Sequence, residues 1–201
     1  MSELDLKREY MFALENVVRD VAEKILAYNC PIHDIKHIKG HEESAIDKLA
    51  YEWMHGALEE HLGSFPDEIK FKGKYLFELH ELQDIESEKK EENKINVMRI
   101  GEIDGTTNTK RRIASKFNYD PNAAVSIALC EDESMGSIII GVVYDMHNRS
   151  IFSGIRVDDG YMAFCDRCLL DPKDFEEKHG DTSTRIMVVG YSNRERIKKA
   201  K

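Results

Sequence analysis

Residues 96–108 place acids, a glycine and hydroxyls directly behind an apolar stretch. Glu102 and Asp104 alternate around Ile103, and Gly105 is followed by Thr106 and Thr107. In an extended strand, residues two apart point to the same side, so we expect both carboxylates to share one face. Carboxylate oxygens suit Mg²⁺, and amides and hydroxyls after a turn glycine suit an anion at a helix start. The stretch therefore predicts a metal-assisted phosphate site.

Two helices precede this stretch. Apolar residues recur at helical spacing from Leu4 to about Tyr28, with charged residues on the opposite side. A second helix is predicted over about 44–62, with Ile46, Leu49, Trp53, Ala57 and Leu58 on one face, and the segment 63–66 ends it. Both helices are expected to cover a sheet.

The remaining elements are predicted to be mostly strands. A strand or short hairpin is expected within 69–79, and the charge run 84–94 is a solvated loop or, alternatively, a flap over a site. Three β-rich runs form an antiparallel meander over residues 123–130, 137–144 and 151–157. A further strand at 185–191 precedes the start of a helix. The fold class is therefore α/β (α+β), a layered sandwich with two N-terminal helices on a largely antiparallel sheet.

Charge and hydropathy exclude several partners. The net charge of -9 and the pI of about 5.4 would repel a nucleic-acid backbone. No apolar run is long enough to cross a bilayer, and the acidic amino terminus is unlike a secretory signal. These features predict a soluble cytoplasmic protein that binds neither nucleic acid nor membrane.

Cysteines and histidines offer two weaker metal hypotheses. Cys165 and Cys168 form a single CxxC, which needs a second ligand pair to hold zinc, and reduced thiols are the simpler interpretation. His33, His37 and His41 are spaced by four, but Pro31 and Gly40 argue against a helix that would align them. A solvated loop is therefore expected there.

The longer pattern resembles the inositol monophosphatase family of magnesium-dependent, lithium-sensitive phosphatases. The pieces come in the order of that family, and the resemblance is strongest between Ile100 and Phe152. They are Ile103-Asp104-Gly105-Thr106-Thr107-Asn108, Ala124 to Leu129, Gly141 to Asp145, and Ile151-Phe152. The resemblance implies the layered α/β sandwich of that superfamily.

The resemblance also implies roles for individual residues. Glu81, Asp104 and the carbonyl of Ile103 would bind metal, and Thr106 would orient the nucleophilic water. Asp47 matches an aspartate that helps activate this water, with Glu43 as a competitor for that role. Bound metal ions would acidify the water, position the phosphate and neutralise the leaving alkoxide.

The chain departs from the family pattern in two places. Gly101 stands where the family has an acid that bridges two metals, and Glu102 could replace that acid only with a local shift in the strand. The second subdomain of the family, with a further metal-binding aspartate, has no counterpart by motif. We therefore expect residues 1–191 to form the N-terminal α/β domain and 192–201 a helix start or tail.

Two functions remain open from the sequence. The first is a Mg²⁺-dependent phosphomonoesterase acting on a small phosphorylated polyol, sugar or nucleotide, with phosphate contacts at Gly105, Thr106 and Thr107. Lys110 and Arg111 could contact the substrate or form a solvated helix face. The alternative is a catalytically impaired relative that binds a phosphorylated ligand or a protein partner. Self-association into a homo-oligomer would bury surfaces that the second subdomain covers.

Overall fold

The computed structural model describes nine ranges of the chain: residues 2–28, 35–38, 41–66, 70–77, 96–105, 109, 121–132, 138–158 and 160–171. The chain divides into two compact units, residues 1–169 and 170–201. Only 170 and 171 of the second unit are described, so the domain boundary predicted at 191 stays a prediction. None of the helices in the described ranges is long and apolar enough to cross a membrane.

Helix α1 (Glu3–Ala27) begins at a capping box. The Asp5 amide donates to the Ser2 hydroxyl (3.1 Å), and the Ser2 amide donates to the Asp5 carboxylate (3.1 Å), which satisfies amides that the first turn leaves free. Its buried face follows the predicted spacing and includes Met11, Leu14, Val18, Val21 and Ile25. The predicted first helix is confirmed.

Helix α2 (Ala45–Gly63) also matches its predicted range and packs against α1. Its fully buried positions are Ile46, Ala50 and Met54, followed by Ala57. Leu49 and Trp53 are only partly buried. The buried face is thus displaced by one position from the predicted one in the middle of the helix.

A seven-stranded sheet carries strands in chain order. It consists of β3 (Gly73–Phe77), β4 (Asn96–Asp104), β5 (Ala124–Cys130), β6 (Ile138–Asp145), β7 (Ser150–Val157), β8 (Gly160–Cys165) and β9 (Cys168–Leu169). All neighbouring pairs are antiparallel except β3 and β4, which run parallel. The predicted largely antiparallel sheet and its meander are confirmed, and the strand predicted within 69–79 is β3.

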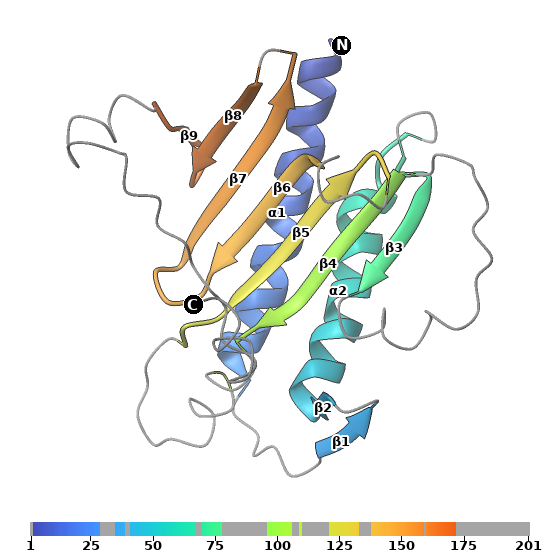
Figure 1. The fold of residues 1–201 in the computed structure, drawn as a ribbon, viewed down its shortest axis with the longest axis vertical. Helices are drawn as coiled ribbons and strands as arrows, with labels where there is room; N and C mark the ends of the chain where they lie inside the picture. Colours follow the sequence, from blue (N-terminus) through green and yellow to red (C-terminus); the bar gives the residue numbers. More distant parts are fainter. Residues whose placement is uncertain are drawn as a thin grey trace, which may run out of the picture. The chain divides into compact units, whose positions relative to one another are not determined.

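Helices α1 and α2 cover one face of this sheet (Figure 1). Alternate residues of strands β4–β8 point into that layer, and the core includes Met98, Ile100, Val125, Ile127, Ile140, Val142, Ile151 and Ile155. The opposite face carries exposed Val143, Phe152 and Tyr161. The predicted site lies at the carboxyl end of β4 in this two-layer structure.

Two further elements differ from expectation. The segment expected to be a loop forms a two-stranded sheet of β1 (Ile35–Ile38) and β2 (His41–Ser44), joined by a two-residue link that contains Gly40. His37 and His41 therefore lie on extended strands, and no helical face aligns them. Strands β8 and β9 were not predicted. The segments 84–94 and 185–191, together with His33, lie outside the described residues.

Candidate functional site

The carboxyl end of β4 carries the predicted acids. Glu102 is buried, with 1% of its surface exposed, and Ile103 next to it joins the core at 8%. Asp104 is exposed. Burying a carboxylate is costly unless donors or cations face it. The buried Glu102 carboxylate therefore indicates polar surroundings inside the end of β4. The Asp104 carboxylate, two residues later, is open to solvent.

A β-bulge interrupts β4 at this point. Gly101 pairs with Ser126 and Asp104 with Ala124, so two residues of β4 oppose the single residue Val125. A bulge of this kind re-aims the side chains that follow it. The strict alternation expected from Glu102 to Asp104 is therefore broken, which explains why Glu102 and Ile103 are both buried.

Gly105 makes the turn after β4. Its φ of +92° is one that side-chain-bearing residues rarely adopt, and a Cβ atom there would lie 2.7 Å from the carbonyl oxygen of Asn122. The Thr109 amide donates to the Gly105 carbonyl (3.2 Å), four residues back as in an α-helix. The Gly105 carbonyl is thus tied to Thr109 by a hydrogen bond with α-helical spacing.

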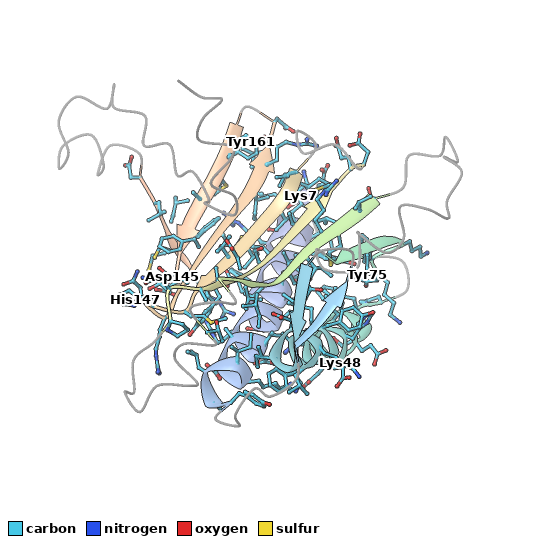
Figure 2. All side chains as sticks on the ribbon, turned by 60° about the horizontal axis from the view of Figure 1, so that its bottom comes forward. Lys7, Lys48, Tyr75, Asp145, His147 and Tyr161 are labelled. Atoms are coloured by element: carbon cyan, nitrogen blue, oxygen red, sulfur yellow. The ribbon has the colours of Figure 1, made fainter. Side chains whose placement is uncertain are left out.

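A hydrogen-bonded support lies behind this turn. Ala123, which approaches Gly105, accepts from the Met146 amide at its carbonyl oxygen (3.0 Å). Asp145 at the end of β6 accepts from the His147 amide (2.9 Å) and from the Asn148 side chain (2.7 Å). Asp145 and His147 lie together at one end of the sheet (Figure 2). These hydrogen bonds therefore connect the ends of β4 and β6 with the start of β5, all at one end of the sheet.

Asp47 reaches the same side of the domain on another element. It lies in the first turn of α2 and is 2% exposed. In Figure 1, α2 begins and α1 ends on the side where β4 ends. An acid in the first turn also stabilises the positive end of the helix dipole. The structure thus brings Asp47 to this side together with Glu102, Ile103, Asp104 and Gly105.

Five predicted site residues lie outside the described residues: Glu81, Thr106, Thr107, Lys110 and Arg111. Their roles stay predictions.

Thr109 also lies at this end of β4, and the sequence analysis did not identify it. It is completely buried, and its hydroxyl donates to the Gly105 carbonyl (3.4 Å), as its amide does. Its spacing of four residues from the turn glycine is the signal that could have identified it, because a helical turn joins residues four apart. Thr109 holds the turn.

One other polar grouping lies away from β4. Within the described ranges, the group of three that could hold a metal ion is Asp20, Glu60 and His61, whose ligand atoms lie within 4.8 Å of one another. His61 is fourteen residues from Asp47 along α2, about 21 Å at 1.5 Å per residue. Its Nε2 lies 2.6 Å from Asp20 Oδ2, so this contact joins the two helices far from the predicted site.

An open hollow of about 490 Å³ lies where α1 ends and β6 ends. It is lined by Arg19, Glu23, Leu26, Ala27, Tyr144 and Arg149. Its volume is in the range of small-ligand sites. The hollow carries two arginines and one glutamate beside the ends of α1 and β6.

Comparison with known proteins identifies the fold. Neither protein-family models nor curated sequences match the chain. Among solved structures, it is similar to the extragenic suppressor protein suhB of Bartonella henselae (24% identity, 80% of this chain, 53% of that one, TM-score 0.51). It is also similar to staphylococcal inositol monophosphatase-1 (16% identity, 85% and 54%, TM-score 0.50). The chain has an inositol monophosphatase-like fold and spans about half the length of these structures.

Proposed function

We propose that the chain is a magnesium-dependent phosphomonoesterase that acts on a small phosphorylated polyol, sugar or nucleotide. The observation that carries this proposal is the bulge between Gly101 and Asp104. Glu102 needs a local shift to stand in for the acid missing at Gly101, and a bulge is the device that shifts a strand by one residue. The fold is consistent with this function.

The donors at this strand end fit a hard divalent cation. Glu102 and Asp104 offer carboxylate oxygens, and Ile103 between them contributes a backbone carbonyl. Oxygen ligands are those that Mg²⁺ prefers. When bound, the metal would supply Lewis acidity for a water and for the phosphate oxygens.

Chain connectivity supports a role for Glu81 near the carboxyl ends of β3 and β4. Because β3 and β4 are parallel, both end on one side of the sheet, and Phe77 is level with Ile100. Glu81 follows Phe77 by four residues, so its Cα lies within about 14 Å of the Cα of Phe77. This reach supports its proposed role as a further ligand.

The remaining roles belong to the turn and to α2. The Gly105 turn would face its amides toward phosphate, and Thr106 would orient the attacking water with help from Asp47. Thr109 would keep the turn closed through its two hydrogen bonds to Gly105. Lys110 and Arg111 are proposed substrate contacts.

The test is phosphate release from a panel of small phosphomonoesters, with and without magnesium. We expect magnesium-dependent release that falls by about a hundredfold in Asp104→Ala and in Glu81→Ala. Glu52→Ala removes an exposed carboxylate from α2 outside the site and should leave the rate unchanged. Wild-type release no faster than that of the Glu81→Ala, Asp104→Ala double variant would refute the proposal.

Gly101 favours a second candidate, a catalytically silent protein that binds a phosphorylated ligand or a protein partner. With glycine at the position of the bridging acid, the site has one carboxylate fewer than the pattern it resembles. Calorimetry that shows phosphomonoester binding without turnover would support this candidate. Magnesium-dependent turnover would exclude it.

Self-association and a cytoplasmic location stay predictions. A second copy would cover apolar side chains such as Val143 and Phe152, which are exposed on the sheet face turned away from the helices. Sedimentation velocity over a range of concentrations checks this, and a monomer at every concentration would contradict it.

A further inference from the structure

The two cysteines of the CxxC segment lie directly opposite each other. Cys165 ends β8, Cys168 begins β9, and the two are cross-strand partners. The turn between them has only two residues, Asp166 and Arg167, with φ of +47° and +67°. Positive φ at both central positions is the type I′ geometry of the tightest hairpins. Opposed residues of an antiparallel pair project their side chains to the same face.

Contacts from distant elements hold this hairpin in place. Arg167 donates to the Glu15 carboxylate (3.0 Å) and to the Asn16 side chain (3.1 Å), and its guanidinium lies 4.9 Å from the centre of the Phe12 ring. The Asp166 amide donates to the Ile151 carbonyl (2.8 Å), and the Asp166 carboxylate accepts from the Ile151 amide (2.9 Å). With both turn residues fixed, the thiols on either side stay close.

The rest of the described chain does not complete a metal site here. Cys130 lies on β5 at the opposite end of the strands, because it pairs with Val97 near the start of β4, whereas Cys165 pairs with Phe152 near the start of β7. Within the described ranges, the group of three ligand atoms close enough for one ion is on α1 and α2. A structural zinc ion needs four ligands. Among the described residues, the pair therefore remains two thiols without further metal ligands.

The spacing of the pair suits a disulfide. Residues that flank a two-residue turn have Cα atoms about 5.5 Å apart. This is close to the commonest Cα separation in disulfides. The side chains of such a pair diverge slightly, so the bond would be strained and easily reduced.

The two thiols differ in their readiness to react. Burial raises the pKa of the Cys165 thiol, and the negative charge of Asp166 raises it further. Cys168 is exposed. Because Cys168 is the more accessible of the two thiols, we expect it to attack first and Cys165 to resolve the intermediate.

We propose that Cys165 and Cys168 are a reversible redox site that closes to a disulfide by exchange with low-molecular-weight disulfides. The Cys168 thiolate attacks one sulfur of the small disulfide, forms a mixed disulfide and releases one small thiolate. The Cys165 thiolate then attacks the Cys168 sulfur and releases the second. The protein loses two electrons and two protons, and the small disulfide is reduced to two thiols.

The test uses the full reduced chain, incubated without oxygen in mixtures of oxidised and reduced glutathione, then alkylated and digested with trypsin after unfolding. Trypsin cuts after Arg167, between the two cysteines, so a disulfide leaves the peptides 157–167 and 168–173 linked. We expect the linked pair in most molecules in the oxidising mixture and its complete loss in the reducing one. Glutathione adducts or free thiols in place of the linked pair would overturn the proposal, as would a link to Cys30 or Cys130.

Single substitutions test the order of attack. Cys165→Ser should accumulate a glutathione adduct on Cys168, because the resolving thiol is gone. Cys168→Ser should form its adduct on Cys165 several-fold more slowly. The control Cys130→Ser, which alters a buried thiol at the opposite end of the strands, should keep the wild-type yield of linked peptides. Faster reaction at Cys165 than at Cys168 would overturn the assigned order.

Discussion

Two tight turns follow strands that run in the same direction in one sheet, and different forces hold them. Gly105 after β4 is fixed by its own positive φ and by the close approach of Asn122, seventeen residues away. The β8–β9 turn is fixed by Arg167, which binds Glu15 across 152 residues of sequence. The first turn depends on the absence of a side chain, and the second depends on the presence of one. A turn held by its backbone conformation can therefore be recognised from its own residues. A turn held by a distant side chain cannot.

The largest expected effect breaks the long-range contact. Arg167→Ala removes the cation from Glu15, which is 0% exposed and otherwise accepts a hydrogen bond from Ser153 (2.7 Å). Leaving a buried charge without its partner costs about 3 kcal/mol. Denaturant unfolding of wild type and variant measures the difference.

A second background tests the reason for this loss. In Glu15→Gln the buried charge is gone, so the additional cost of Arg167→Ala should fall to about 1 kcal/mol, that of an ordinary hydrogen bond. Equal losses in both backgrounds would mean that charge burial is not what holds the hairpin.

The next effect breaks the backbone-held turn. Gly105→Ala places a Cβ 2.7 Å from a backbone oxygen at a φ of +92°, and we expect about 2 kcal/mol of lost stability. Gly160→Ala is the matched control, because Gly160 also has a positive φ but no heavy atom within 4 Å of the added Cβ. Its smaller loss would isolate the contribution of the clash, and equal losses would assign the whole effect to φ.

A glycine in α2 should respond in the opposite direction. Gly56 is exposed, and an added Cβ there meets nothing within 4 Å. Gly56→Ala should therefore raise the free energy of unfolding by about 1 kcal/mol, because alanine favours the helix. A loss at this position would undermine the steric explanation given for Gly105.

The smallest effect concerns a contact that is held by a side chain but is local. Hydrogen bonds from the Ser2 hydroxyl and then from the Ser2 amide lower the pKa of Asp5. A lowered pKa in the folded state means that the stabilisation is present above the pKa of the unfolded chain, about 4, and is lost as pH falls through the folded value. Over that range, the protection of the first-turn amides of α1 against hydrogen exchange, measured relative to their intrinsic exchange rates, should fall.

Asp5→Asn provides the control for the helix cap. Without the carboxylate, exchange in the first turn should lose this additional acid dependence. A variant that responds to acid as the wild type does would show that Asp5 is not the group responsible.

Sequence patterns predicted the elements whose signal lies within one segment. Apolar spacing was sufficient for α1, α2 and the β5–β7 meander, because each buries one face against the same layer. Strands β8 and β9 were missed because the turn between them is Asp166-Arg167, which lacks the glycine or asparagine typical of a type I′ turn. Contacts with α1 hold that turn, and no local pattern contains them.

The candidate site was predictable to a similar degree. Gly105 was identified from the motif, and its positive φ and close contacts agree with the expected turn. The bulge was not predicted, because it depends on how β4 pairs with β5 and not on the residues of β4 alone. Glu102 and Asp104 were therefore expected to share one face, although one is buried and the other exposed.

The chain order of the strands has a consequence for synthesis. Each strand pairs with the next one made, so the sheet can grow hairpin by hairpin from β4 onward, but α1 is made before these strands and packs on β5, β6 and β7. More than 120 residues separate the end of α1 from the end of β7. At ribosomal speeds, part of the apolar face of α1 would wait about ten seconds for its partners, with only α2 available to shield it.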